Sequence, residues 1–250
     1  MTKRLAGKVA LVTGGGRGMG RGIAEAFASE GANVIVNYVN NTAAAEAVVA
    51  KVESYGGQAI AVKANVGDEN AVQAMIDAGV KKFGTIDILV NNAGMINQVP
   101  LHEMSIDTWD EMIRIHMRGM FLTSRFTIPH MLKQQSGRII NVSGTFGITG
   151  GAEFTHISAA KAGMIGFSRA LAREVGKKGI NVNVISPAIT RTDLYDFVPA
   201  DERDAIIATY PLGRPGEIED IANTAVFLAS KESSFFTGQT LCPNGGDFMV

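Results

Sequence analysis

A glycine-rich turn near the start of the chain has the residue types and spacing of a phosphate-binding loop. A short apolar run, Lys8–Thr13, leads into glycines at positions 14, 15, 16, 18 and 20, and a helical pattern follows over Arg21–Glu30. A helix that begins on glycines presents free N–H groups and the positive end of its dipole to an anion, and the missing Cβ atoms let a pyrophosphate come close. The turn therefore indicates a dinucleotide site, although a tight strand-to-helix turn without a ligand would show the same pattern.

Composition limits the classes of protein that this chain can be. Its 250 residues, 46% of them hydrophobic, are enough for one large α/β domain. The 23 basic and 24 acidic residues form no run of like charge, which argues against nucleic acid or an acidic membrane surface as a partner. Cys242 is the single cysteine, and no apolar run approaches the roughly 18 residues of a membrane span. We therefore expect a cytoplasmic protein with a single domain over residues 1–250, a small-molecule ligand and no metal site.

Short apolar segments alternate with segments of helical periodicity along the rest of the chain. This alternation predicts an α/β fold, a doubly wound parallel sheet of Rossmann type with helices on both faces. After Lys8–Thr13, the expected strands are Asn33–Tyr38, Gln58–Val62, Ile86–Asn91, Arg138–Ser143, Ile180–Ser186 and Gln239–Cys242.

Three later helices and a flap complete the predicted arrangement. The helices are Asp107–Lys133, Ile157–Lys177 and Glu217–Ser230. Pro129 is expected to kink or shorten the first of them, because proline cannot donate the helical hydrogen bond. The stretch Pro187–Pro215 holds four of the seven prolines and predicts a mobile flap outside the sheet.

Several separated motifs together resemble the short-chain dehydrogenase/reductase superfamily over essentially the whole chain. They are Thr13-Gly14-x-x-x-Gly18-x-Gly20, Asn91-Asn92-Ala93-Gly94, Lys161-Ala162-Gly163, and Ser186-Pro187 followed by Thr192. One departure is Ala188, where the family usually has a glycine after the proline. The resemblance implies a nicotinamide-dependent oxidoreductase fold.

The family normally works with four side chains, Asn, Ser, Tyr and Lys, and three of these types are missing here. The resemblance places His116 in the asparagine position, Gly144 in the serine position and Ile157 in the tyrosine position, and only Lys161 matches. In the family, the tyrosine hydroxyl transfers the proton while lysine and the oxidised cofactor lower its pKa from about 10. A hydrocarbon such as Ile157 cannot donate a proton.

Neighbouring polar residues are poor substitutes for the missing side chains. His156 lies about 140° round the helix from Lys161, whereas Ser158 is only about 60° away but carries a short and weakly acidic hydroxyl. Ser143 precedes Gly144 on a strand, where neighbours face opposite sides, so it would substitute only through a bulge.

Two residues at family positions can still carry chemistry. His116 could act as a general acid or base near neutral pH, or could be a helix histidine whose hydrogen bonds are satisfied, and the second interpretation is favoured. Lys161 in the family also binds the cofactor ribose, so its presence supports cofactor binding more than catalysis.

The predicted cofactor is NADP(H) or NAD(H), with weak binding or an empty pocket as open alternatives. The second strand ends at Tyr38 without the carboxylate that prefers NAD, and Arg17 adds a cation in the glycine turn, which favours NADP(H). Asn65, before Val66, replaces an aspartate that usually accepts from the adenine amino group. The resemblance places these residues at the cofactor: Gly14, Arg17, Gly18, Met19, Gly20, Tyr38, Asn65, Val66, Asn92, Ala93, Gly94, Lys161, Pro187 and Thr192.

The missing side chains lead to two hypotheses about function. The preferred one is a catalytically inactive subunit that supports an active paralogue in a hetero-oligomer. The alternative is an NAD(P)-dependent alcohol or carbonyl oxidoreductase that uses His116, Lys161 or the substrate itself for proton transfer. Without such a paralogue we expect a homo-oligomer built on the two long helices, and the substrate is not readable from the sequence.

Overall fold

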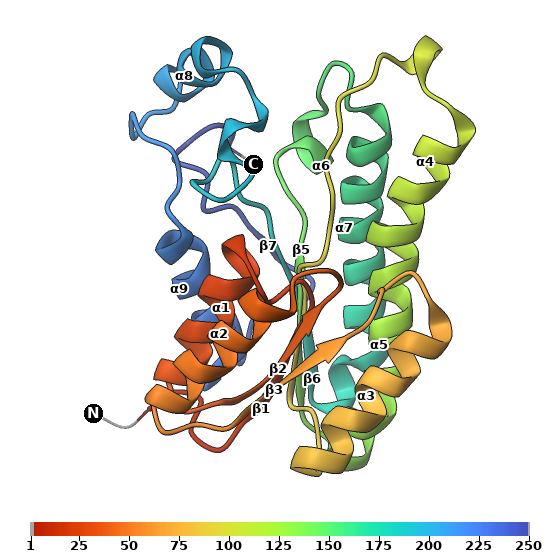
Figure 1. Ribbon diagram of the computed structural model, residues 1–250, viewed down its shortest axis with the longest axis vertical. Coiled ribbons are helices and arrows are strands. Elements are labelled where there is room, and N and C mark those ends of the chain that lie inside the picture. Colours follow the sequence, from red (N-terminus) through yellow and green to blue (C-terminus); the bar gives the residue numbers. More distant parts are fainter. Residues whose placement is uncertain (1–2, 250) are drawn as a thin grey trace.

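A seven-stranded sheet in which all strands are parallel forms the centre of the molecule (Figure 1). The computed structural model describes residues 3–249. The strand order is β3-β2-β1-β4-β5-β6-β7, so the order reverses between β1 and β4. The strands are β1 Val9–Val12, β2 Asn33–Tyr38, β3 Ala59–Lys63, β4 Ile88–Asn91, β5 Gly137–Val142, β6 Ile180–Ile185 and β7 Thr240–Leu241. The predicted doubly wound parallel sheet is therefore confirmed, and β2 has the predicted bounds.

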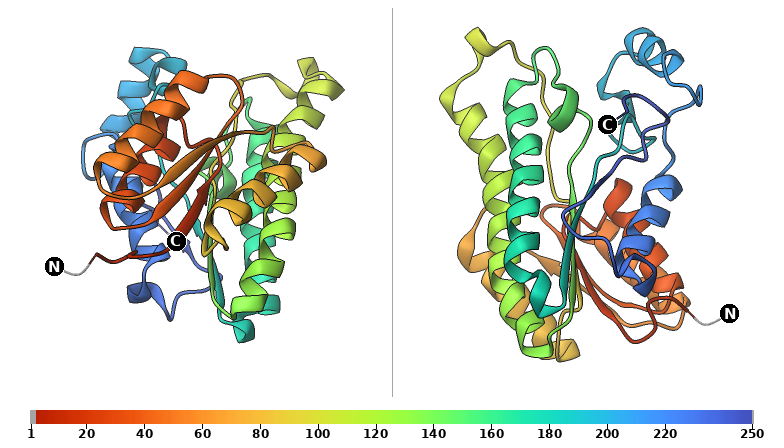
Figure 2. Two further views of the ribbon diagram at one scale, coloured as in Figure 1. Left: turned by 60° about the horizontal axis from the view of Figure 1, so that its bottom comes forward. Right: turned by 180° about the vertical axis from the view of Figure 1, so that it is seen from behind.

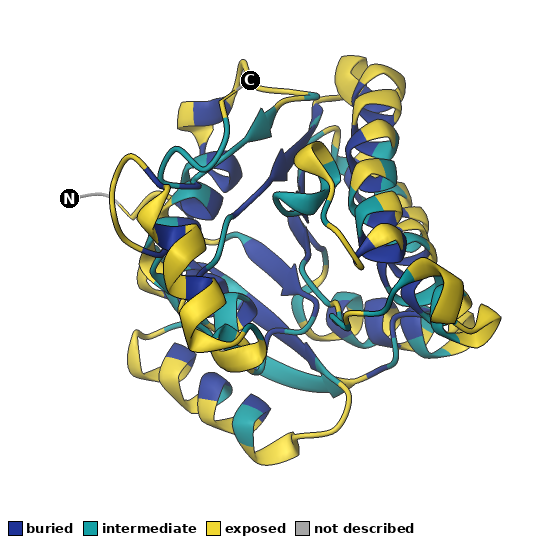
Figure 3. Ribbon diagram, turned by 90° about the horizontal axis from the view of Figure 1, so that it is seen from above, coloured by how far each residue is buried: buried dark blue, intermediate teal, exposed yellow. Residues whose placement is uncertain are grey.

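Helices cover both faces of this sheet (Figure 2). The helices are α1 Gly18–Ser29, α2 Thr42–Ser54, α3 Glu69–Phe83, α4 Ile106–Ile113, α5 Gly119–Gln134, α6 Phe146–Thr149, α7 Thr155–Val175, α8 Ala200–Ala208 and α9 Ile218–Ala229. Helices α1, α2 and α9 enclose one apolar core with the sheet, and α3, α5 and α7 enclose the other. Because both faces are covered, the central strands are buried almost throughout (Figure 3).

The irregular part of the predicted helix Asp107–Lys133 lies near its middle and not at Pro129. A π-helical turn, η2, occupies Arg114–Arg118 between α4 and α5. Helix α5 continues through Pro129 to Gln134, so the prediction that proline shortens the helix is wrong. A π turn widens the helix by one residue and redirects the side chains on it, and His116 is one of those side chains.

The stretch Pro187–Pro215 lies outside the sheet, as predicted, but it is not structureless. It contains a 3₁₀ turn, η4, at Tyr195–Phe197 and the helix α8. Arg203 of α8 stacks on the Tyr195 ring, with its guanidinium carbon 4.0 Å from the ring centroid, and pairs with Asp196 over 2.7 Å. These contacts give the flap an internal packing of its own.

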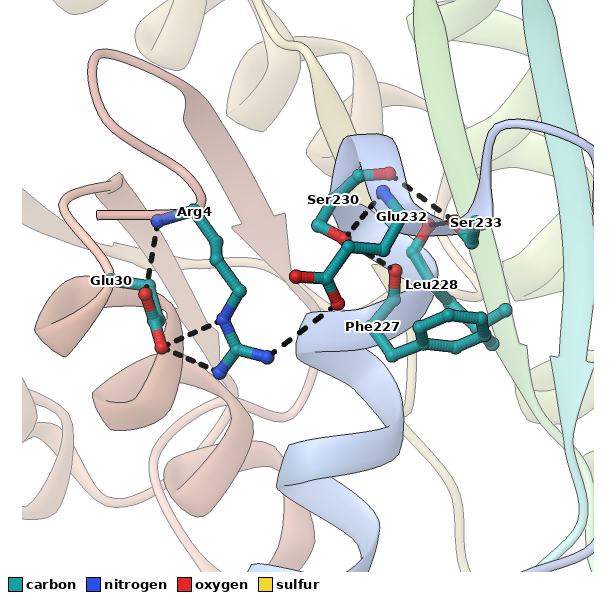
Figure 4. A network of polar contacts seen from close by, with 7 residues as sticks. All are labelled: Arg4, Glu30, Phe227, Leu228, Ser230, Glu232 and Ser233. Atoms are coloured by element: carbon teal, nitrogen blue, oxygen red, sulfur yellow. Dashed lines mark hydrogen bonds and ion pairs between the residues drawn. The ribbon is translucent and has the colours of Figure 1, made fainter. Parts of the chain in front are cut away.

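A polar network fixes the end of α1 and the end of α9 to the start of the chain (Figure 4). The backbone N–H and the guanidinium of Arg4 both donate to the Glu30 carboxylate at the end of α1. The same guanidinium lies 3.9 Å from Glu232, which follows α9. None of the helices between residues 3 and 249 has the length and apolar character needed to cross a membrane.

Candidate functional site

The glycine turn between β1 and α1 has the close backbone packing of a phosphate cradle. Gly14 and Gly18 adopt positive φ angles of 60° and 51°, which favour glycine. A Cβ on Gly20 would lie 2.3 Å from the Gly14 carbonyl oxygen and 2.5 Å from Asn92 Nδ2. The sequence thus keeps side chains out of the space around the start of α1, where free N–H groups point outward. These features fit a dinucleotide pyrophosphate.

The end of β4 is held directly against this turn. Thr13 Oγ1 accepts hydrogen bonds from the backbone N–H groups of Asn92 and Ala93, at 2.9 and 3.0 Å. The Asn92 side chain donates to the Thr13 carbonyl oxygen over 2.9 Å. The structure therefore brings together the glycine turn and the Asn92-Ala93-Gly94 segment, 78 to 80 residues apart in sequence.

The adenosine end of the expected site contains a contact that the sequence did not reveal. Asn65 Oδ1 accepts from the Gly67 N–H over 3.0 Å and from Arg114 Nη1 over 3.3 Å. The guanidinium of Arg114 is also paired with Glu111, which raises the pKa of Arg114 and lowers that of Glu111. Arg114 lies on the π turn, so no periodic pattern pointed to it. Val66 is buried, Tyr38 ends β2, and Arg17 is exposed at the N-terminus of α1.

The segment after β6 lies beside the other end of the cradle. The Pro187 carbonyl oxygen accepts from the Thr145 N–H over 3.1 Å, which ties the ends of β5 and β6 together. A Cβ on Gly18 would lie 3.5 Å from Thr192 Cβ. Pro187 therefore lies beside the end of β5, and Thr192 lies beside the glycine turn.

Lys161 on α7 reaches the end of β5, where its Nζ donates to the Val142 carbonyl oxygen over 2.8 Å. Burial disfavours the charged ammonium and lowers the pKa of Lys161 to about 7. An amine with this pKa is present in both protonation states near neutral pH, so it is able to donate or accept a proton.

His116 is buried in the π turn and is held by the loop after β4. Its Nε2 lies 3.2 Å from the Met95 nitrogen and 3.0 Å from the Met95 carbonyl oxygen. Burial, together with the nearby charge of Lys161, lowers the pKa of His116 to about 3. The imidazole is therefore neutral at physiological pH, so no imidazolium is present there to act as a general acid. Only Nε2 is bonded, because Nδ1 is buried without a hydrogen-bond partner within residues 3–249. The expectation of a histidine with its hydrogen bonds satisfied therefore holds for one ring nitrogen and not for the other.

The positions of Gly144 and Ile157 differ in how they would accept a larger side chain. Gly144 does not adopt a left-handed backbone, and a Cβ there would meet only the Pro187 carbonyl oxygen at 3.9 Å among the described residues. Ile157, only 4% exposed, packs with Met112, Phe154 and Ala160 in a small apolar cluster. Position 144 is thus open, whereas position 157 is filled by packing.

The neighbouring polar residues do not replace the missing side chains. Ser143 Oγ donates to the Lys161 carbonyl oxygen over 3.0 Å, so it fastens α7 to β5. His156 is buried and its Nε2 lies 2.6 Å from Asn97 Oδ1, on the loop after β4. Ser158 Oγ is buried and has no hydrogen-bond partner within residues 3–249.

A doubly wound parallel sheet with a glycine cradle at its carboxyl edge, and a lysine of lowered pKa beside it, defines a nicotinamide-dependent oxidoreductase scaffold. The chain belongs to the short-chain dehydrogenase/reductase superfamily, because the family model described as enoyl-(acyl carrier protein) reductase matches residues 14–247. It is 42% identical over 242 residues to a 3-oxoacyl-[acyl-carrier-protein] reductase of Staphylococcus aureus strain N315, covering 97% of this chain and 98% of that protein. It is 40% identical over 245 residues to the enzyme of the same name from Salmonella typhimurium, covering 98% of each.

These relatives overturn the preferred hypothesis from the sequence. Proteins that match this chain over nearly its whole length carry the name of an active reductase, so the expectation of a catalytically inactive subunit is wrong. The names of these relatives give no support to a hetero-oligomer with an active paralogue. The physical reason for the error is that missing family side chains were equated with missing proton chemistry. The expected cofactor class, NADP(H) or NAD(H), is that of the family, and this prediction is confirmed.

The contact distances at Gly20 lead to a test of the cofactor cradle. We expect Gly20→Ala to abolish NADPH binding, because a Cβ 2.3 Å from the Gly14 carbonyl oxygen must push the turn and α1 apart. Fluorescence titration with NADPH measures the loss, and urea unfolding shows whether the fold survives. Gly176→Ala, just after α7, is the matched control, since nothing lies within 4 Å of its Cβ and its φ of −58° suits alanine. Unchanged NADPH affinity in Gly20→Ala would contradict this assignment of the cradle.

Proposed function

We propose that this chain, acting as a single domain over residues 1–250, is an NADP(H)- or NAD(H)-dependent reductase of a ketone carbonyl, with Lys161 as its proton donor. The observation that carries the proposal is the Lys161 Nζ, placed at the end of β5 with a pKa lowered to about 7. The relatives named 3-oxoacyl-[acyl-carrier-protein] reductase support a ketone as the substrate class.

The residues divide the work between binding and proton transfer. Gly14, Gly18 and Gly20 would hold the pyrophosphate, while Arg17, Tyr38, Asn65 and Val66 would lie toward the adenosine. Asn92, Ala93, Gly94, Pro187 and Thr192 would hold the nicotinamide end, and the reduced cofactor, when bound, would supply a hydride to the carbonyl carbon. Lys161 would give a proton from its ammonium to the carbonyl oxygen, so that the ketone becomes an alcohol and the lysine becomes neutral. Proton transfer through water or through the substrate itself is the second candidate route.

The support for Lys161 over His116 comes from their surroundings. His116, with a pKa near 3, is a neutral imidazole at neutral pH, whose remaining N–H is a far weaker acid than an ammonium group, and its Nε2 is engaged by Met95. Lys161, with a pKa of about 7, has both its ammonium and its neutral form within reach near neutral pH. Its bond to the Val142 carbonyl oxygen also fixes the direction of the amine, which orients one of its protons and leaves the others for a substrate.

The lowered pKa of Lys161 predicts the pH dependence of the reaction. Reduction requires the protonated amine, which is populated below the pKa of about 7 and lost above it. We expect kcat/KM for ketone reduction to fall about tenfold per pH unit above pH 7, and the oxidation of the alcohol to rise over the same range. Steady-state assays of ketone reduction and of alcohol oxidation from pH 5.5 to 9.5 measure both dependences. Lys161→Met should lose the dependence together with most of the rate. A flat profile in the natural chain would show that Lys161 is not the donor.

The open space at Gly144 and the packed space at Ile157 predict the result of restoring the family side chains. Gly144→Ser combined with Ile157→Tyr should fold, with a loss of about 1–3 kcal/mol of stability because Ile157 is already packed. It should raise ketone reduction about 10²- to 10⁴-fold, because a phenol near Lys161 is a better placed acid. Gly144→Ser combined with Ile157→Phe is the matched control, with the same ring but no hydroxyl. The same gain in both variants would attribute the effect to packing. No gain in the tyrosine variant would show that position 157 does not face the substrate.

We also propose a cytoplasmic homo-oligomer that pairs through α5 and α7. Phe121 and Leu132 support this surface, because both lie on α5 with exposed fractions of 44% and 40%. Light scattering during gel filtration at micromolar concentration should give the mass of a dimer or tetramer. A single 26.4 kDa species at that concentration would exclude the assembly.

A further inference from the structure

Thr145 and Asp247 bring a hydroxyl and a carboxylate to the place where the family serine is missing. Thr145 follows Gly144 at the end of β5, and its Oγ1 donates to Asp247 Oδ2 over 3.0 Å. The same Oγ1 lies 3.3 Å from the Pro187 carbonyl oxygen. A Cβ at position 144 would approach that same oxygen, at 3.9 Å. The Thr145 hydroxyl therefore lies in the neighbourhood of the open serine position.

Three separate parts of the chain meet at this point. The Thr145 N–H donates to Pro187, at the end of β6, over 3.1 Å. Asp247 belongs to the segment after β7, which is fixed to the flap by the bond from the Leu212 N–H to the Gly245 carbonyl oxygen, also 3.1 Å. The carboxyl ends of parallel strands are where ligands bind in sheets of this type. The hydroxyl and the carboxylate are thus presented at the ligand-binding edge.

The Asp247 carboxylate has no cationic partner among the residues that the structure describes. Within residues 3–249 it forms no ion pair with lysine, arginine or histidine. Its charge is felt by the buried Tyr210, whose pKa rises to about 12, first through burial and then through Asp247, against the opposing effect of the Ile189 N–H. Oδ2 of Asp247 accepts the hydrogen bond from the Thr145 hydroxyl. The second oxygen, Oδ1, therefore remains able to accept a hydrogen bond from a ligand.

We propose that Asp247, held by Thr145, is a specificity-determining residue that selects ketones bearing a hydroxyl or protonated amine on the carbon next to the carbonyl. The inference rests on the proposed reductase function. A carboxylate accepts hydrogen bonds from both groups, attracts the ammonium and repels a carboxylate at the same position. Asp247 therefore contacts the substituent, while Lys161 contacts the carbonyl oxygen. Thr145 is a positioning residue, because it orients the carboxylate.

Four compounds with one scaffold test this selection. They are acetophenone, α-hydroxyacetophenone, α-aminoacetophenone and benzoylacetate. On the carbon next to the carbonyl they carry, in that order, a hydrogen, a hydroxyl, an ammonium and a carboxylate. For the natural chain with NADPH, we expect kcat/KM for the amino and hydroxy ketones to exceed that for acetophenone at least about tenfold, with benzoylacetate lowest. Asp247→Asn keeps the acceptor for Thr145 but removes the charge. It should lose most of the preference for the ammonium ketone over acetophenone and raise the kcat/KM for benzoylacetate relative to acetophenone.

Asp201→Asn is the matched control, because Asp201 is an exposed carboxylate on α8 and the charge change is the same. An equal change of ratios in Asp201→Asn and Asp247→Asn would show a long-range charge effect and overturn the proposal. Ratios unaltered by Asp247→Asn would overturn it as well. If none of the four ketones is reduced, the proposed function fails for them. Calorimetry then tests the inference separately, by measuring how tightly α-aminoacetophenone binds to the NADPH-loaded natural chain and to NADPH-loaded Asp247→Asn. An affinity about tenfold lower in Asp247→Asn supports the inference, and an equal affinity overturns it.

Discussion

The close approach of the glycine turn to the end of β4 is the constraint on which the rest of the site depends. Thr13 Oγ1 receives two backbone N–H groups from the β4 side, and the Asn92 amide returns a bond to the Thr13 carbonyl oxygen. These contacts close the space at the point where the strand order reverses, so that only a glycine fits at position 20. A network of satisfied buried bonds is rigid, because breaking any one leaves a polar group unpaired. The cradle is therefore preorganised before any cofactor arrives.

A second network of buried hydrogen bonds extends from the end of β4 into the core. Asn91, the last residue of β4, donates to the side chain of Asn141 on β5 over 2.8 Å, and Asn141 donates to Ser168 on α7 over 2.7 Å. Thr123 of α5 donates to Asn91 Oδ1 over 2.6 Å. This buried chain fixes α5 and α7 to the carboxyl half of the sheet. Lys161, two turns before Ser168 on α7, is thereby held at the end of β5, and its low pKa is a consequence of that placement.

The features that could be predicted from the sequence are those with local causes. Hydrophobic alternation and the glycine turn indicated the parallel sheet, and the strand Asn33–Tyr38 was predicted with its observed bounds. The π turn at Arg114–Arg118 was not predictable, because one extra residue in a helix leaves no periodic mark in so short a segment. The Thr145–Asp247 contact joins residues 102 apart, and nothing local to either residue reports it. Proton chemistry was misjudged for a related reason, since the burial that lowers the pKa of Lys161 depends on the packed fold.

A proton donor is a matter of pKa and reach, not of residue type. A phenol needs help from a lysine and a cation to lower its pKa from about 10, whereas a lysine buried at the end of a strand arrives near neutrality through desolvation alone. Ile157 fills the tyrosine position with apolar atoms and packs with Met112, Phe154 and Ala160. Lys161, four residues further along α7, has its amine at the end of β5, where burial favours the neutral form. The proton donor that we propose therefore depends on how α7 packs against β5, and not on the side chain at the tyrosine position.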